Sequence, residues 1–199
     1  MAVQSGVYRG VSAQERAAER RRRLLEATLS VWADPATRTT MTAVCGEAGL
    51  TERYFYESFR GLDEALSAVL EDVATEIESR TLAAAEAAGA DPAARITAAV
   101  TAFVDLLAAD PRKGRVAIIE AAALPGLRGR RTELLRHFGR LAAEEAHHHA
   151  PRRHEDELAG LMFIGGMAEV VTAWLDGALE VDPEEVVATA ARAYLGLYG

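Results

Sequence analysis

The chain has 199 residues, of which 50% are hydrophobic and 26% charged, with a formal net charge of −8. This length suits one compact unit or a small domain plus a larger one, and the composition allows a real hydrophobic core. The single cysteine, Cys45, excludes an internal disulfide, and the first ten residues lack the apolar run of a signal peptide, so we expect a cytoplasmic protein.

The negative charge is unevenly distributed along the chain. Nine arginines balance nine acidic residues between Met1 and Glu64, so the whole excess lies in the remainder. Arg16 and the run Arg20–Arg23 gather near the start. An acidic body with a basic front end orients toward a polyanion such as DNA without binding it everywhere. The alternative is an ordinary solvated helix face.

Apolar spacing and helix breakers predict nine helices and almost no strand. Asp34-Pro35 ends the first of them, Gly49 the second and Gly61 the third. A long apolar stretch, residues 158–175, is near the lower limit for crossing a bilayer, and we interpret it instead as a helix buried on two sides. The predicted helices span approximately residues 14–32, 41–47, 51–59, 63–88, 92–107, 112–124, 130–148, 154–179 and 182–197.

Residues 40–59 carry the most informative pattern, two short helices joined by a tight turn. Cys45 supplies the small side chain where the helices cross, and Gly49 the positive φ of the turn. Phe55 and Phe59 fall on the inward face of the second short helix. An outward face of Arg, Tyr and Ser suits the major groove and its phosphates. The residues left to face outward or along the edges are Glu52, Arg53, Tyr54, Tyr56 and Ser58.

The segment from Arg21 to Leu66 resembles the N-terminal DNA-binding domain of TetR-family regulators. The resemblance rests on the Arg-rich first helix with Leu24, Leu25 and Ala27, on Thr39-Thr40, Val44 and Ala48-Gly49-Leu50-Thr51, and on Phe55-Tyr56, Phe59, Asp63 and Leu66. It implies an all-α fold: a flexible arm at 1–14, a three-helix DNA-binding domain with a helix-turn-helix at 15–64, and a six-helix ligand-binding and dimerisation domain at 65–199.

The resemblance also implies three partners: double-stranded operator DNA, a small-molecule effector of unknown identity and a second copy of the chain. We expect a repressor that the effector releases, and the apolar residues of the C-terminal helices favour a small apolar effector. The family often has a histidine where Ser58 stands and a phosphate-binding lysine where Leu62 stands, so we expect Arg60 to replace that contact. The DNA-contacting residues expected on this basis are Thr40, Thr42, Glu52, Arg53, Tyr54, Tyr56, Ser58 and Arg60.

Large apolar residues in the C-terminal helices mark either a ligand cavity or ordinary core. Glu120 and Glu169 stand in apolar surroundings and are either ligand anchors or interface partners. The candidate cavity residues are Phe103, Leu107, Ile119, Glu120, Phe138, Met162, Phe163, Met167, Glu169 and Trp174. The eighth helix is too apolar all round to serve one core alone, which predicts a homodimer. The candidate interface residues are Leu158, Leu161, Gly165, Gly166, Val187, Ala190 and Tyr194.

No nucleophile–base pairing, phosphate-cradling glycine loop or metal-ligand spacing appears, so we expect no enzyme, no cofactor and no metal. Cys45 is either a redox switch or the small residue of the helix crossing, and we favour the crossing. His147–His149 point about 100° apart on a helix, which favours a frayed helix end over a metal site. The rival hypothesis is a helical ligand-binding protein or enzyme that does not bind DNA.

Overall fold

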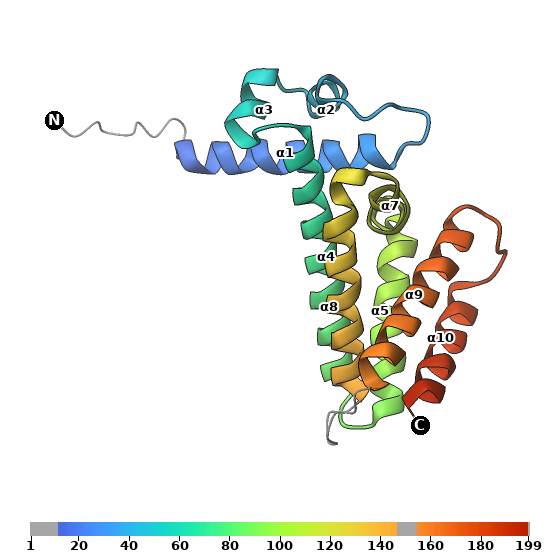
Figure 1. Cartoon of the computed structure of the whole chain (residues 1–199). Helices are drawn as coiled ribbons and strands as arrows, with labels where there is room; N and C mark the ends of the chain where they lie inside the picture. Colours follow the sequence, from blue (N-terminus) through green and yellow to red (C-terminus); the bar gives the residue numbers. More distant parts are fainter. Residues whose placement is uncertain (1–11, 147–154, 199) are drawn as a thin grey trace. The chain divides into compact units, whose positions relative to one another are not determined.

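The computed structural model describes residues 12–146 and 155–198, and over these ranges every regular element is a helix (Figure 1). The chain divides into two compact units, one ending at Glu71 and the other beginning at Asp72. The division falls inside α4 (Leu62–Ala87). The all-α prediction is therefore confirmed for the described residues.

The first unit consists of α1 (Ala13–Ala33), α2 (Met41–Ala48), α3 (Glu52–Ser58) and the first turns of α4. In Figure 1, α1 lies across both short helices. The three helices and α4 share one apolar cluster, in which Leu24, Val44, Phe55 and Ala65 are fully buried. Because Ala65 of α4 packs in this cluster, the unit extends beyond residue 64, where the sequence placed its end.

Helix α1 begins with a capping box. The Ser12 hydroxyl accepts a hydrogen bond from the Glu15 backbone at 3.0 Å, and the Glu15 carboxylate accepts one from the Ser12 backbone at 2.5 Å. Ser12 to Gln14 therefore form the cap and first turn of α1, which corrects their assignment to a flexible arm. The rest of the predicted arm, residues 1–11, lies outside the described residues.

The turn between α2 and α3 has the predicted glycine geometry. Gly49 has φ +60°, and the Leu50 N–H donates to the Cys45 carbonyl at 3.0 Å. This pairing satisfies a carbonyl that the helix end leaves without an intrahelical partner. Gly49 therefore ends α2 and starts the turn, as the sequence predicts.

The second unit contains the rest of α4, then α5 (Pro92–Ala109), α6 (Pro111–Gly114), η1 (Arg115–Glu120), α7 (Ala121–Ala123), η2 (Pro125–Leu127), α8 (Arg128–Ala146), α9 (Glu155–Leu175) and α10 (Pro183–Tyr198). The stretch predicted as one α-helix over 112–124 is a helix interrupted by the π-helical η1. Apolar spacing does not distinguish the i→i+4 hydrogen bonds of an α-helix from the i→i+5 bonds of a π-helix, so the sequence missed this change.

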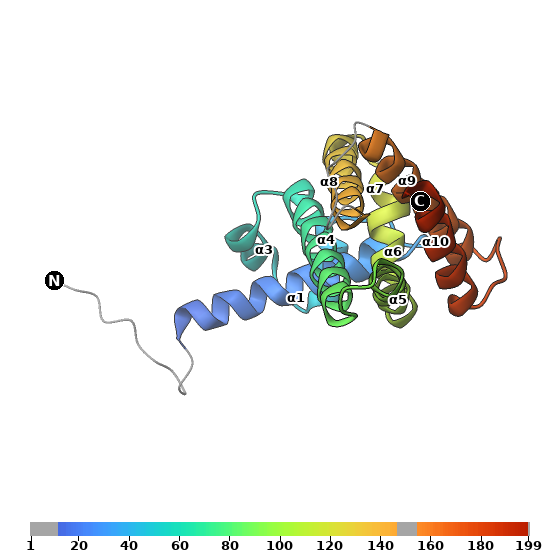
Figure 2. The ribbon, with the colours of Figure 1, turned by 90° about the horizontal axis from the view of Figure 1, so that it is seen from below.

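Two close packings organise the second unit. Helix α10 packs on α5 and α9 around an apolar cluster that includes Phe163, Met167 and Tyr194, and Figure 2 shows α9 and α10 side by side. Helices α8 and α9 cross at Gly139 and Gly160, where a Cβ added to Gly160 would lie 2.1 Å from the Gly139 carbonyl oxygen. Only glycine at position 160 permits this approach.

Two helices of the second unit are long and apolar enough to cross a membrane by length and composition alone. They are α5 and the stretch of α9 from Asp156 to Leu175. Both contribute side chains to the apolar cluster shared with α10, as the core helices of a soluble protein also do. This measure is weak evidence for a membrane span.

Candidate nucleic-acid interface

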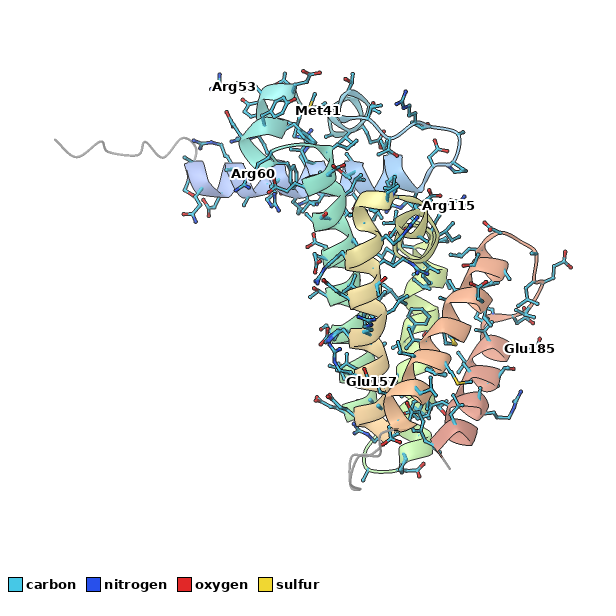
Figure 3. The ribbon with its side chains drawn as sticks, in the orientation of Figure 1. Met41, Arg53, Arg60, Arg115, Glu157 and Glu185 are labelled. Carbon is cyan, nitrogen blue, oxygen red and sulfur yellow. The ribbon has the colours of Figure 1, made fainter. Side chains whose placement is uncertain are left out.

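Helix α3 has two faces of different chemistry. Phe55, fully buried, and the capping residue Phe59, 2% exposed, anchor it in the core of the first unit. Tyr56 is 59% exposed, and Arg53 carries its guanidinium on the outer side of the helix, away from α1 (Figure 3). At 100° per residue the exposed positions form one continuous arc. The residues of this arc, which we call the α3 outer face, are Glu52, Arg53, Tyr56 and Glu57.

Tyr54 and Ser58 lie on the side of α3 that faces α1, and both are half-buried. The guanidinium carbon of Arg20 lies 4.5 Å from the centre of the Tyr54 ring. The Arg21 guanidinium donates a hydrogen bond of 2.8 Å to the Ser58 carbonyl. These two residues, predicted to meet DNA, are thus contacts between α3 and α1 in this structure. Sequence reasoning missed Glu57, whose exposed carboxylate completes the outer face.

The remaining predicted DNA contacts surround the start of α2 and the end of α3. Thr40 is the N-cap of α2, and its hydroxyl accepts from the Ala43 backbone at 3.1 Å. Thr42 is exposed, with its hydroxyl 3.5 Å from a Glu52 carboxylate oxygen. Arg60 is also exposed. Leu62 packs against the apolar cluster of the first unit, so its side chain serves the core.

The arginine run of α1 is engaged within the first unit. Arg23 donates to the Ala48 carbonyl at the end of α2 at 2.5 Å. Arg22 makes an ion pair with Glu19 at 2.6 Å on the solvent side. Arg20, Arg21 and Arg23 thus contact α2 or α3, while Arg22 lies on the solvated side of α1. The run keeps its positive charge, so its attraction to DNA stays a prediction.

Cys45 is 5% exposed in the apolar cluster, at the position where the helices cross. Burial, and secondly the negative charge of Glu52, raises the pKa of its thiol. The thiol therefore stays protonated at neutral pH and is a poor nucleophile. This supports the packing interpretation over a redox switch.

The candidate cavity residues fall into separate groups in the second unit. Phe163 and Met167 lie in the apolar cluster of α5, α9 and α10, and Phe103 and Trp174 pack against it. Leu107 of α5 is fully buried, and one of its methyl carbons lies 3.3 Å from a Cβ added to Gly114 of α6.

The other candidates lie elsewhere on the second unit. Ile119 and Phe138 are half-buried, the Phe138 ring lying 5.7 Å from that of His137. Met162 is 59% exposed and Glu169 is also exposed, so neither lines an interior cavity of the single chain. Their positions on α9 turn them away from the cluster that holds Phe163 and Met167.

Glu120 is paired rather than isolated. Its carboxylate lies 3.2 Å from Nε of Arg115, which also contacts Asp176 at 3.3 Å. An open depression of about 760 Å³ is formed by α5 together with Ala84 of α4. Its lining consists of small side chains that sequence reasoning did not single out: Ala84, Ala93, Ala94, Thr97, Ala98, Thr101, Ala102 and Asp105.

Of the predicted dimer residues, those on α9 are mostly exposed and those on α10 are not. Leu158 is 63% exposed. Gly165 and Gly166 are exposed on the same side of the helix, together with Met162 and Glu169. We call these five residues the α9 outer face. Leu161 is half-buried against Gly139, and Val187 packs on the apolar cluster.

Ala190 and Tyr194 are buried inside the chain, which corrects their assignment to the interface. The Tyr194 hydroxyl donates to the Ala142 carbonyl at 2.6 Å, and its ring packs edge-on against Phe163. The apolar stripe of α10 therefore completes the core of its own unit. The large apolar side chains that α10 exposes are Leu195 and Leu197, which the sequence did not assign to an interface.

Among residues 12–146 and 155–198, no three histidine, cysteine or acidic side chains come together as a metal site. The run His147–His149 lies outside the described residues. The expected frayed end is therefore not tested.

Comparisons with known proteins give a structural likeness without a close relative in sequence. No family model matches the chain, and no curated protein matches it. A TetR-like regulator from Rhodococcus sp. RHA1 superposes with a TM-score of 0.73 at 18% identity, covering 92% of this chain and 97% of its own. A TetR-family regulator from Streptomyces coelicolor gives 0.71 at 14% identity, covering 90% and 80%.

The chain has the fold of the TetR-family transcriptional regulators. A further structure with this fold is the regulator FadR from Bacillus subtilis in complex with stearoyl-CoA. It has a TM-score of 0.73 and 18% identity, with 89% of this chain and 97% of the other covered. The TetR fold extends over both units, whereas the sequence resemblance was close only between Arg21 and Leu66.

Proposed function

We propose that the protein is a TetR-type transcriptional repressor that binds operator DNA through α3 and is released by a small apolar effector. The α3 outer face carries the proposal, because Arg53 and Tyr56 project from a helix whose opposite side is locked in the core. Arginine recognises guanine edges or phosphates, and a tyrosine hydroxyl binds phosphate. A TetR fold with this outer face fits a helix that enters the major groove.

The operator-binding form is proposed to be a homodimer. The α9 outer face is apolar apart from Glu169, and Gly165 and Gly166 have nothing within 4 Å of an added Cβ, so a second helix can approach closely. A twofold dimer would present two copies of α3, which must lie about 34–36 Å apart to enter successive major grooves. The expected operator is therefore an inverted repeat.

The effector is proposed to act through α4. This helix is continuous from Leu62 to Ala87, so its first turns belong to the first unit and its remainder to the second unit. A ligand bound among the helices near Phe103 and Met167 would shift α4 and thereby α3. The side chains packed in that region are apolar, which favours an apolar molecule or group. The FadR neighbour is a regulator of this fold solved with stearoyl-CoA, whose acyl chain is apolar and whose coenzyme A part is charged. Such coupling is typically about 1–3 kcal/mol.

The first experiment selects bound duplexes from a random DNA pool and measures their affinity. We expect enrichment of an inverted repeat with half-site centres about one helical turn apart. Failure to enrich any sequence would favour the rival hypothesis, a helical ligand-binding protein without DNA binding. Light scattering at micromolar concentration tests the dimer separately, and a monomer would contradict it.

The second experiment titrates the selected duplex with and without a long-chain acyl-CoA shown to bind the protein. Weaker operator binding at saturating acyl-CoA is the expected result. Unchanged operator affinity would remove acyl-CoA as the effector and leave the DNA-binding proposal intact.

A further inference from the structure

The arginine run of α1 lies against the recognition helix, and its contacts there have a directional character that the apolar core lacks. Helix α3 has only seven residues, too few to be stable alone, so tertiary contacts must set its orientation. Phe55 and Phe59 bury one side of it, but apolar burial is non-directional. Hydrogen bonds and cation–π contacts depend on geometry, so they can fix the rotation of α3 about its own axis.

Arg21 holds the C-terminal end of α3. Its guanidinium carbon lies 4.3 Å from the centre of the Phe59 ring, and its Nη1 donates to the Ser58 carbonyl at 2.8 Å. The last carbonyls of a helix have no intrahelical donor and carry partial negative charge, so a cation placed there is stabilising. This contact is half-buried, which shields it from solvent more than an exposed ion pair.

Arg20 holds the middle of the same helix. It stacks on Tyr54 at 4.5 Å, and its Nη2 lies 3.6 Å from Glu57. The other oxygen of Glu57 pairs with Arg53 at 3.1 Å. A chain of contacts therefore runs from α1 through Glu57 to the arginine on the outer face of α3. Arg22 lies between Arg21 and Arg23 in the sequence. The recorded hydrogen bonds and ion pair of its side chain are all with Glu19 of the same helix.

We propose that Arg20 and Arg21 are positioning residues for operator recognition. Their contacts with α3 are made at Tyr54, Glu57, Ser58 and Phe59. These contacts fix the rotation of α3 about its axis, and thereby the direction in which Arg53 and Tyr56 face the bases and phosphates. The inference rests on the proposed DNA-binding function. It assigns Arg20 and Arg21 the role of orienting α3, whereas the charge pattern alone would predict that they contact the phosphate backbone of DNA.

The test compares Arg21→Gln with Arg22→Gln, two variants that remove the same charge from neighbouring positions of one helix. Affinity is measured by fluorescence anisotropy for the selected operator and for a scrambled duplex of equal length, over a series of salt concentrations. Arg22→Gln should weaken both duplexes to a similar, small extent and leave their ratio unchanged. Arg21→Gln should lower the ratio of operator to scrambled affinity about tenfold or more, which is the effect of misplacing the reading of one base pair.

This ratio separates positioning from simple destabilisation. A variant that is partly unfolded loses active protein and weakens both duplexes equally, so its ratio is that of the wild type. Circular dichroism establishes the folded fraction of each variant. Equal ratios in folded Arg21→Gln and Arg22→Gln would overturn the proposal, whereas a wild-type chain without preference for any duplex would first overturn the proposed function itself.

Arg21→Lys provides the second variant in case Arg21→Gln does not fold. Lysine keeps the charge but has no flat guanidinium to stack on Phe59 while donating to Ser58. We expect the scrambled duplex to bind as in the wild type and the operator to bind more weakly. A wild-type ratio in folded Arg21→Lys would show that charge alone suffices and would overturn the positioning role.

Discussion

The outer faces of α3 and α9 are both exposed, yet they have opposite chemistry. The α3 outer face consists of two glutamates, an arginine and a tyrosine, while that of α9 consists of Leu158, Met162, two glycines and one glutamate. On the α3 outer face, Arg53 and Tyr56 can donate hydrogen bonds to phosphates and base edges, while the carboxylates of Glu52 and Glu57 can only accept them, for example from cytosine. An exposed apolar face is unfavourable in water and suits a protein partner. Exposure therefore locates both surfaces, and side-chain chemistry indicates their different partners.

The inner side of α3 should account for its stability and the outer side for its function. Phe55→Ala removes a fully buried ring from the core of the first unit, and we expect it to lower the free energy of unfolding by about 3–5 kcal/mol. Tyr56→Ala, at the next position but 59% exposed, should change it by no more than about 0.5 kcal/mol. Chemical denaturation measures both. Equal losses would mean that the two faces of α3 are not distinct.

The apolar α9 outer face can be tested by placing a charge in it. Met162→Lys should raise the dimer dissociation constant by about a hundredfold or more, because two lysine charges would lose their hydration at a twofold interface. Leu82→Lys is the matched control, an equally polar change at an exposed apolar residue of α4. Sedimentation over a concentration series measures both constants. A Met162→Lys dimer as stable as the control would exclude this face from the interface.

The inner side of α9 depends on backbone approach rather than on side-chain burial. Gly160→Ala places a methyl group 2.1 Å from the Gly139 carbonyl oxygen, so α8 and α9 must separate. We expect a loss of about 1–3 kcal/mol in the free energy of unfolding. Gly129→Ala, on α8 with nothing within 4 Å of the added Cβ, should be neutral or slightly stabilising. Comparable thermal midpoints for the two variants would contradict the close crossing.

The smallest expected effect concerns Tyr194 of α10. Burial, followed by the charges of Tyr198 and Glu145, raises the pKa of its hydroxyl. Because the unfolded chain loses this proton near pH 10 while the folded chain keeps it, stability should fall as pH rises above about 10. Tyr194→Phe loses the hydrogen bond to the Ala142 carbonyl, worth about 1 kcal/mol at neutral pH, and should flatten that decline.

Unfolding curves between pH 7 and 11 measure the effect of Tyr194→Phe, with Tyr198→Phe as the comparison. Burial raises the pKa of Tyr198 to about 12, and its hydroxyl donates a longer hydrogen bond of 3.3 Å to the backbone carbonyl of Asp156. Its effect at neutral pH should be smaller. An alkaline decline as steep in Tyr194→Phe as in the wild type would exclude Tyr194 as a cause.

The sequence predicted the first unit more completely than the second, for a physical reason. The turn at Gly49 and the inward faces of Phe55 and Phe59 follow from local helix geometry within twenty residues. The burial of Ala190 and Tyr194 depends on α5 and α9, which are distant along the chain. Helical periodicity shows that α10 has an apolar stripe, but it does not show whether that stripe meets its own core or a partner.

The arginine run illustrates the same limit inside the first unit. Charge and spacing place Arg20 and Arg21 on α1, but whether they face solvent or α3 depends on how the two helices cross. The sequence likewise did not predict the close approach of Gly139 and Gly160, because a single glycine in a helix does not indicate which other helix packs against it. Sequence reasoning singled out Gly165 and Gly166 as candidate residues of the dimer interface and gave no role to Gly139 or Gly160.

Operator affinity of Arg53→Ala tests the central claim most directly. The side chain is exposed and its contact is a surface ion pair with Glu57, so the fold should be unaffected. If Arg53 reads a base, the variant should bind the selected operator more weakly by about 1–3 kcal/mol while a scrambled duplex changes little. Tyr56→Phe should instead weaken both duplexes alike, as expected for a phosphate contact. Wild-type operator affinity in both folded variants would contradict the assignment of α3 as the DNA-reading helix.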